Sequence, residues 1–567
     1  MKKNSFVISA IILALGGFFA KAIGAIYKIP LTNILGSSGM GLYYLIFPIY
    51  SLIITICSSG ISVSLSMEVA KCRKVRNIYN EHKLFRVALI ITFLISLFFT
   101  IIILIFSKTI AEMQGNVNAS IGYITISPAI IISSLIATIR GYFQGIENMV
   151  PTTVSLIIEQ IAKLSIGLIL AHRLCVYGIG YAVVGAIIGV TVSEIVALII
   201  IAINYISYKG QLRYNYRNLF YKSKRKFNHL GLIKNKIKTN KKILSSQIYK
   251  TNKDAVRYST KVSIKKLLKS SVVNTLSSIV IPVATMLDSF MIINILVSSG
   301  FSSHVSTALY GLSGGVVQSL TSLPIILITG IATTLVPSLS GLVAQNDTNE
   351  IKHRTKFFIK ITWVLSLIMF VIVYVYAEDY IRFLYGDGLD SVVIDEYFYL
   401  VRMMKVNSVS IIYYAFLQTL ISIFQAIGKS FIPFITLLVS VVVRTIFVYS
   451  LTGIVEVNIF GGLIANIIFL IISSSILIWN LKKYMQFDMH FMRELFQPII
   501  VSGIVFVFMV ISDWALKSSI NYFASMISTA IVGIVIYILW IYFGNVFSKK
   551  EKKYLNFSRK KVMKSLK

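Results

Sequence analysis

The sequence contains few of the residues on which metal binding and redox chemistry depend. Its 567 residues include only 3 cysteines and 6 histidines. The cysteines form no Cys-x-x-Cys pair and no disulfide framework, and the histidines are scattered. We therefore predict no metal site. The loops also show no catalytic carboxylate pair and no nucleophile elbow, so we predict no catalytic residues and no enzyme activity.

Charge is also scarce, and most of it has one sign. Charged residues make up 13% of the chain, whereas a soluble protein carries about 25%. Lysine and arginine number 55 against 21 acidic residues, which gives a net charge of +34. The basic residues lie in loops between apolar runs rather than on one folded face with aromatic platforms. This distribution excludes a nucleic-acid partner.

Long apolar runs fill the rest of the chain, and hydrophobic residues make up 56% of it. Runs of about 20 residues are long enough to cross a hydrocarbon core about 30 Å thick. The sequence therefore predicts an all-α polytopic membrane protein. We expect about fourteen transmembrane helices, near 6–29, 42–65, 84–106, 119–139, 152–171, 179–206, 270–296, 309–337, 357–377, 404–426, 431–453, 459–481, 496–514 and 522–545.

The first apolar run resembles a signal peptide, because Lys2 and Lys3 precede it and Ala20-Lys21-Ala22 has the form of a cleavage site. A lysine inside that triplet is unusual, and further spans follow. We therefore interpret this run as an uncleaved first helix.

Basic residues gather in every second loop, as expected for the cytoplasmic side of a membrane protein. An even number of spans, with both termini cytoplasmic, fits this pattern in the cytoplasmic membrane. The 207–266 segment holds 18 Lys or Arg and one acid, Asp254. We expect a basic loop against the anionic inner leaflet, so membrane lipids are a predicted partner. The alternative is a docking arm for a cell-wall synthesis enzyme.

The chain repeats itself weakly. Phe143-Gln144-Gly145-Ile146 corresponds to Phe424-Gln425-Ala426-Ile427, at matching positions in the predicted topology. Two parallel six-helix lobes, related by an axis along the membrane normal, explain this pattern, and such transporters place substrate between the halves. The predicted divisions are an N-lobe at 1–206, a basic cytoplasmic loop at 207–269, a C-lobe at 270–481, two extra helices at 482–548 and a basic cytoplasmic tail at 549–567.

Several motifs carry a resemblance to a known family. They are Lys21-Ala22-Ile23-Gly24-Ala25-Ile26-Tyr27-Lys28-Ile29-Pro30-Leu31, Gly39-Met40-Gly41-Leu42-Tyr43, Arg140-Gly141-Tyr142-Phe143-Gln144-Gly145, Glu159-Gln160, Leu309-Tyr310-Gly311 and Ala332-Thr333-Thr334-Leu335-Val336-Pro337. Together they resemble the stage V sporulation protein B family, over the chain through about residue 545. Ser62 stands where we expect that family's proline.

The resemblance implies membership of the superfamily of multidrug/oligosaccharidyl-lipid/polysaccharide flippases, related to lipid II flippases. It implies a two-lobed exporter that alternates between inward-open and outward-open states. It also implies an anionic, undecaprenyl-linked saccharide pyrophosphate as the transported partner. The peptidoglycan precursor for spore cortex or cell wall is the expected cargo.

Charged residues inside spans are the candidate cavity residues, because such charges are costly in a membrane. Lys21 and Lys28 are seven residues apart, which places them on one helix face about 10 Å apart along the axis. Both match basic residues in the first helix of the resembled family. A pair of ammonium groups would attract a pyrophosphate, and the alternative for Lys28 is snorkelling to the outer interface.

Four further charges join this candidate site. Glu159 and Lys163 are spaced i, i+4 and are predicted to pair. Arg444 corresponds to Lys163 in the repeat, so it should face the cavity or a partner such as Asp288, which would otherwise bind a coupling cation. Glu194 is a weaker candidate, and Arg140 is interpreted mainly as an anchor. Gln144 and Gln425 are candidates either for sugar contacts or for capping helix ends.

No ATP motor is expected. Gly428-Lys429-Ser430 has the end of a Walker A motif, but Ile423 replaces its first glycine. No cofactor is predicted, and the energy source is instead a coupling cation (Na⁺ or H⁺), the membrane potential or consumption of the product. Two alternative functions remain open at this point. One is an ion-coupled multidrug exporter, and the other is a membrane glycosyl polymerase or ligase.

Overall fold

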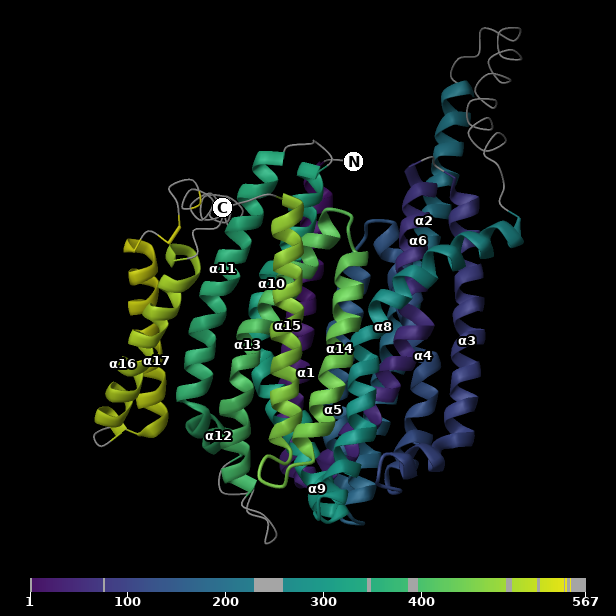
Figure 1. The fold of residues 1–567 in the computed structure, drawn as a ribbon. Helices are drawn as coiled ribbons and strands as arrows, with labels where there is room; N and C mark the ends of the chain where they lie inside the picture. The colour runs from purple at the N-terminus through teal and green to yellow at the C-terminus, as the bar shows by residue number, and fades with distance from the viewer. Residues whose placement is uncertain are drawn as a thin grey trace.

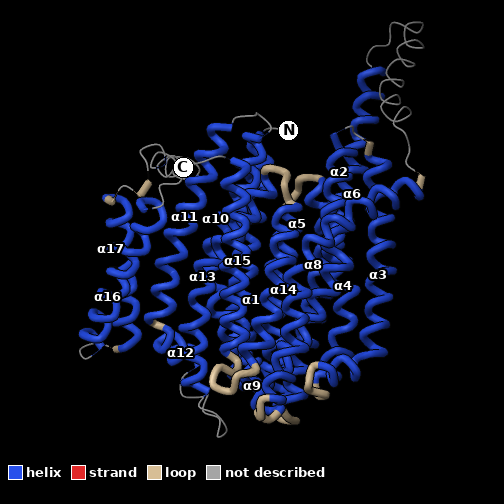
Figure 2. The backbone as a smooth tube through the Cα atoms, viewed as in Figure 1, coloured by secondary structure: helices blue, strands red, loops and turns tan. Residues whose placement is uncertain are grey.

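A computed structural model describes residues 3–74, 77–228, 259–343, 348–385, 396–485, 492–517, 521–544, 546–547 and 551. Within these residues all regular structure is helical (Figures 1 and 2), which confirms the predicted fold class. The elements are α1 (Lys3–Ile54), η1 (Thr55–Ser59), α2 (Gly60–Lys74), α3 (Ile78–Met113), α4 (Ala119–Gly145), α5 (Val150–Cys175), α6 (Ile179–Asn228), α8 (Thr260–Ser298), α9 (Ser303–Tyr310), η2 (Gly311–Val317), α10 (Gln318–Val343), α11 (Thr348–Val375), α12 (Ala377–Tyr385), α13 (Glu396–Ala426), α14 (Phe431–Thr452), α15 (Phe460–Met485), η3 (Met492–Phe496), α16 (Gln497–Lys517) and α17 (Tyr522–Phe543).

Thirteen helices in the described part of the chain are long and apolar enough to cross a membrane. The first candidate runs from Leu15 to Arg73, so it includes the predicted segment 42–65 and overlaps most of the predicted segment 6–29. Within that run, Gly36 interrupts the helix with a backbone φ of 66° and ψ of −176°. The chain is therefore a multi-pass membrane protein, while the count of fourteen spans stays a prediction.

The sequence predicts a loop over the whole basic segment 207–269, but part of this segment is helical. Helix α6 continues to Asn228, and α8 begins at Thr260, so helix replaces loop at both ends of the segment. Loss of hydrophobicity marks where an apolar run stops, but lysine, arginine and glutamine still favour helix. The remaining residues, 229–258, lie outside the described part, as do most of the residues in the predicted 549–567 tail.

The packing of the first half recurs in the second. Helix α6 packs against α4 and α5, and α15 packs in the same way against α13 and α14. Likewise, α3 packs on α4 and α11 packs on α13. In Figure 1, α2, α3, α4 and α6 lie on the right, and α16 and α17 form the left edge. These matching pairs support the predicted two-lobe organisation, with α16 and α17 as additions.

The halves meet at a close contact between α1 and η2. A Cβ added to Gly311 would lie 2.3 Å from the backbone nitrogen of Gly41. Only glycine permits backbones to approach this closely. The contact brings residues of α1 beside the helices of the second half, where they help to line the cavity described below.

The 140–145 motif packs α4 against its neighbours. A Cβ on Gly141 would lie 2.6 Å from the Ser62 carbonyl oxygen, and one on Gly145 would lie 2.7 Å from that of Ser66. Small residues four apart therefore let α4 approach α2, as is common in membrane helices. Tyr142 is fully buried and donates a hydrogen bond of 2.7 Å to Glu81 on α3. The motif thus fixes three helices of the first half.

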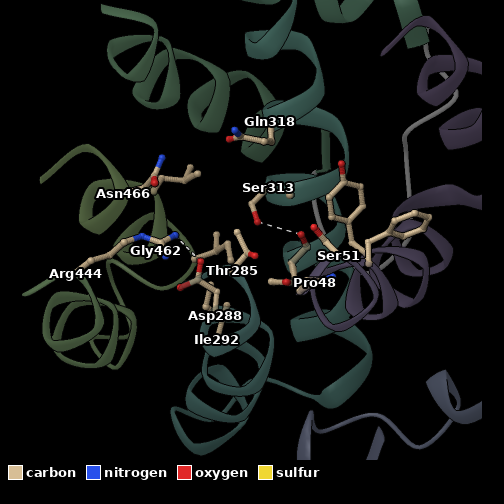
Figure 3. A pocket seen from close by; sticks show the side chains of 16 residues that line it. Pro48, Ser51, Thr285, Asp288, Ile292, Ser313, Gln318, Arg444, Gly462 and Asn466 are labelled. Atoms are coloured by element: carbon tan, nitrogen blue, oxygen red, sulfur yellow. Dashed lines mark hydrogen bonds and ion pairs between the residues drawn. The ribbon is translucent and has the colours of Figure 1, made fainter. Parts of the chain in front are cut away.

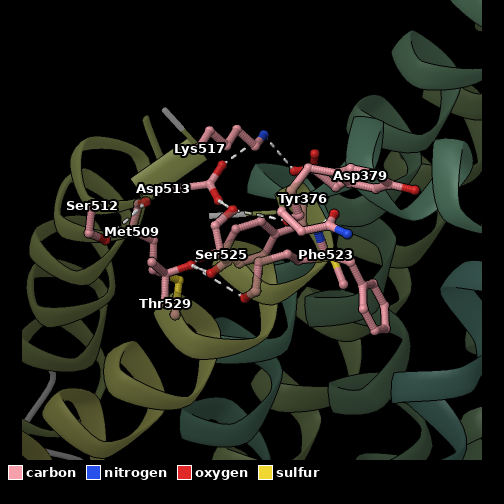
Figure 4. Close-up of polar contacts among 12 residues, drawn as sticks. Tyr376, Asp379, Met509, Ser512, Asp513, Lys517, Phe523, Ser525 and Thr529 are labelled. Atoms are coloured by element: carbon pink, nitrogen blue, oxygen red, sulfur yellow. Dashed lines mark hydrogen bonds and ion pairs between the residues drawn. The ribbon is translucent and has the colours of Figure 1, made fainter. Parts of the chain in front are cut away.

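Ion pairs attach the α16–α17 hairpin to the second half at both of its ends. Lys517 on α16 lies 2.8 Å from Asp379 on α12 and 2.8 Å from Asp513 (Figure 4). Near the other end, the buried Lys360 of α11 lies 2.9 Å from Glu494 of η3. Buried charges need such partners because they are costly to desolvate alone. The hairpin is therefore fixed to α11 and α12.

Candidate functional site

A cavity of about 310 Å³ lies between the two halves of the chain. Its walls come from α1, α8, η2, α10, α14 and α15, and Figure 3 shows polar side chains pointing into it from several of these helices. The lining residues are Tyr44, Phe47, Pro48, Ser51, Thr285, Asp288, Ile292, Tyr310, Ser313, Gly314, Gln318, Arg444, Ile459, Gly462, Leu463 and Asn466. A mixed apolar and polar wall of this kind is typical of a ligand site.

Arg444 and Asp288 form an ion pair in the lining of this cavity (Figure 3). Arg444 projects from the middle of α14 and is 8% exposed, and Asp288 comes from α8. The pairing is one of the two arrangements that the sequence predicts for Arg444. The Arg444 Nε is buried and has no hydrogen-bond partner among the described residues. The guanidinium therefore keeps one donor available inside the cavity wall.

Two lysines of the first half adjoin the same cavity through its aromatic lining. Lys28 on α1 donates a hydrogen bond to the hydroxyl of Tyr44, and its Nζ lies 4.9 Å from the centroid of that ring. Lys163 on α5 has its Nζ 5.3 Å from the Tyr27 ring centroid and 5.4 Å from that of Phe47. These distances permit cation–π attraction. Tyr44 and Phe47 in turn line the cavity.

Neither of these lysines has a carboxylate within ion-pair distance in the described part of the chain. The predicted pair between Glu159 and Lys163 is not formed. Glu159 instead lies 2.8 Å from Arg140 of α4, whose Nε also donates to Ser155 at 2.9 Å. Spacing along α5 makes Lys163 a possible partner, but helix packing brings the longer Arg140 side chain to the carboxylate. Arg140 is thus an anchor between α4 and α5.

The other predicted residues lie away from this cavity. Lys21 is exposed on α1 and does not line it. Gln144 and Gln425 stand at the last turns of α4 and α13, where their backbone carbonyls accept hydrogen bonds from Glu147 and Gly428. These are backbone contacts that any residue could make, so the roles predicted for the two glutamine side chains stay predictions. The structure therefore places Asp288 and Arg444 in the cavity lining and Lys28 and Lys163 against its aromatic lining residues, whereas Lys21, Gln144 and Gln425 do not line it.

Sequence reasoning missed several lining residues. Gln318 and Asn466 are polar side chains within spans, and such residues usually face a protein interior or a cavity. That rule would have found both of them. Tyr44 and Phe47 carry no comparable signal, because aromatic residues are common on every face of a membrane helix.

Family comparisons agree with this architecture. The polysaccharide biosynthesis protein family matches residues 6–343, more than half of the chain. The chain belongs to the polysaccharide biosynthesis protein family. The lipid II flippase MurJ family also matches residues 251–533. Stage V sporulation protein B of Bacillus subtilis (strain 168) is 23% identical over 466 residues, which cover 82% of this chain and 81% of that protein. The resemblance drawn from the sequence motifs is confirmed.

Two solved structures of other proteins have the same fold as this chain. The lipid II flippase MurJ in an inward-closed conformation has a TM-score of 0.67 and 16% identity, covering 94% of this chain and 99% of its own. A multidrug resistance MATE family transporter of the MOP superfamily, in an inward-facing conformation, has a TM-score of 0.63 and 15% identity. It covers 82% of this chain and 94% of its own. At these identities the likeness shows the fold alone.

Proposed function

We propose that this polysaccharide biosynthesis family protein is a flippase for an anionic, undecaprenyl-linked saccharide, with the peptidoglycan precursor lipid II as its cargo for cell wall or spore cortex. The observation that carries the proposal is the arrangement of Lys28 and Lys163. Each ammonium group lies over the ring of an aromatic residue that lines the central cavity, Tyr44 for Lys28 and Phe47 for Lys163, and within the described residues neither lysine has a carboxylate partner. The relatives support the same cargo class, because one matched family is that of a lipid II flippase.

Electrostatics explains why such groups suit this substrate. A pyrophosphate inside a membrane protein loses most of its hydration, and fixed cations offset that cost only while they stay charged and facing it. Lys28 and Lys163 would supply the main attraction for the two phosphate groups. The spare Nε donor of Arg444 would add one hydrogen bond from the opposite wall. The lobes would then move around this site as access alternates.

The multidrug-exporter alternative is less well supported by the cavity. A site for cationic drugs needs unpaired negative charge, and Asp288 is the single acidic residue in its lining. Arg444 already neutralises that carboxylate. A coupling cation or the membrane potential would supply the energy for transport, and the likeness to the MATE transporter structure agrees with cation coupling.

The orientation of the protein forms part of this proposal. We place it in the cytoplasmic membrane with both termini inside, because basic loops mark the cytoplasmic side. Cell-wall synthesis enzymes would then be partners that supply or consume the cargo. A reporter fused within 229–258 should be cytoplasmic and one within 386–395 external. The reverse result at either site would contradict this orientation.

A liposome assay tests the transport function directly. The purified full-length protein is reconstituted with fluorescent lipid II, and movement between leaflets is measured from the accessibility of the label to a membrane-impermeant quencher. The wild type should move the lipid. Lys28→Gln combined with Lys163→Gln should reduce the rate about a hundredfold or more, since each charged hydrogen bond contributes about 1.5–3 kcal/mol.

Lys108→Gln is the matched control, because Lys108 is exposed on α3 and pairs with Glu112 at 3.9 Å, away from the cavity. It should retain the wild-type rate. Unchanged movement in the double variant would exclude this headgroup site. Export of a cationic dye with no movement of lipid II would instead favour the drug-exporter function.

A further inference from the structure

Glu194 is a buried acid in the first third of α6 that the proposed headgroup site does not use. It is 5% exposed. Its Oε1 atom accepts a hydrogen bond from the Tyr50 hydroxyl on α1 and another, of 2.6 Å, from Ser133 on α4. Three helices of the first half therefore converge on one carboxyl group.

The second oxygen of this carboxyl group has no partner. Glu194 Oε2 is buried and makes no hydrogen bond to any described residue. Glu194 also forms no ion pair in the described ranges, unlike Glu159, which pairs with Arg140. The charged groups that face it are Lys163 and Glu159 of α5, which act on it only through the longer-range electrostatic field.

An ionised carboxylate in this position would leave one bare anionic oxygen away from water, which is strongly unfavourable. The neutral acid fits the same geometry at much lower cost. The acid's own O–H, formed on Oε1, would donate to Ser133 Oγ, and Tyr50 would still donate to Oε1. The unpartnered Oε2 would then be an uncharged carbonyl oxygen, which tolerates a missing hydrogen bond far better.

We propose that Glu194 is a proton-binding site and carries a coupling proton. The reaction is one carboxylate plus one proton from the aqueous phase to give one carboxylic acid, and it needs no other reactant. Its coupling role rests on the proposed function. A proton on Glu194 and an anionic headgroup beside Lys163 bring opposite charges into the same half of the protein, so the two binding events favour each other.

Infrared difference spectroscopy of the purified full-length protein tests the site without transport. The wild type at neutral pH should show the carbonyl stretch of a protonated carboxylic acid, shifted in D₂O. Glu194→Gln should remove this band. Glu159→Gln is the matched control and should keep the band, because Glu159 is ionised in its pair with Arg140.

Tyr50→Phe offers a second test that leaves the acid in place. It removes one hydrogen bond to Oε1 and should move the band without abolishing it. Equal thermal unfolding midpoints would show that the variants are folded. The proposal is overturned if Glu194→Gln leaves the spectrum unchanged. It is also overturned if the band appears only after Na⁺ is removed, since a metal cation would then occupy the carboxylate.

A transport measurement is the third test of this proposal. Lipid II movement by the wild type should respond to an imposed proton gradient, and movement by Glu194→Gln should not. Absence of movement in every variant would contradict the proposed function while leaving the infrared result for Glu194 intact. A gradient response that persists in Glu194→Gln would show that the coupling proton binds elsewhere.

Discussion

The two halves of the molecule hold a buried positive charge in different ways. Lys163 of α5 and Arg444 of α14 occupy corresponding positions in the predicted repeat. Lys163 rests between the rings of Tyr27 and Phe47. Arg444 instead forms an ion pair with Asp288 of α8. The cation–π contacts leave Lys163 without a counter-ion, whereas the ion pair cancels the charge of Arg444.

This difference shows how a symmetric architecture acquires an asymmetric site. Each half places a long basic side chain near the middle of an apolar helix, where it needs support. In the first half the support comes from polarisable rings, and Lys28 adds a second cation beside Tyr44. In the second half it comes from a carboxylate. An anionic headgroup would therefore bind toward the first half, and the second half would contribute mainly to stability.

The largest expected effect concerns that stability. Asp288→Asn leaves the Arg444 guanidinium buried without its counter-ion, and breaking a buried pair costs about 3–5 kcal/mol. We expect a clear fall in the midpoint of thermal unfolding of the purified protein in detergent. Adding Arg444→Gln to Asp288→Asn should recover part of the loss. Glu112→Gln is the control, because its exposed pair with Lys108 contributes about 0–1 kcal/mol. An unfolding midpoint equal to that of the wild type would mean that Arg444 is not desolvated.

Much of the fold could be predicted from the sequence, because membrane spans are read from hydrophobicity alone. The positions of the apolar runs required no knowledge of tertiary contacts. Hydrophobicity did not predict the end of α6, because this helix continues through polar residues to Asn228. The sequence also did not reveal that the first two apolar runs are joined. In the structure both lie in α1, where only the backbone conformation of Gly36 interrupts the helix.

The candidate site could be predicted only in part. Rules for charge inside a membrane identified Lys28, Lys163 and Arg444, and mid-span charge also indicated Asp288 as a partner. Local spacing misled at Glu159, since its partner Arg140 comes from another helix. Contacts between helices depend on crossing geometry, which a single sequence does not give. The aromatic neighbours of the lysines were missed for the same reason.

The next largest expected effect is on the transport rate, which should fall more when the buried cation of the first half is removed than when that of the second half is removed. Lys163→Gln should slow lipid II movement in liposomes about tenfold, because it removes an unpaired charge. The paired variant Arg444→Gln with Asp288→Asn removes two charges that already cancel. It should slow movement only about threefold, which is the effect of losing one neutral-strength hydrogen bond. Rates are compared at equal amounts of reconstituted, folded protein. An equal loss in both variants would show that Arg444 grips the headgroup directly and would end the proposed asymmetry.

The smallest expected effect concerns two lysines on the same helix. Lys21 and Lys28 are two turns apart on α1, and spacing alone makes them equivalent. Their surroundings differ, because Lys28 is partly buried and contacts the cavity residue Tyr44, whereas Lys21 is exposed. Exposed substitutions usually change free energies by less than about 0.5 kcal/mol. Lys21→Gln should therefore alter lipid II movement by less than about twofold, and Lys28→Gln should reduce it several times more. Lys28→Arg, which keeps the charge, should retain more activity than Lys28→Gln. If Lys21→Gln proves as damaging as Lys28→Gln, the headgroup must pass Lys21 in another state of the transport cycle, and the cationic surface of the first half extends along the whole of this helix face.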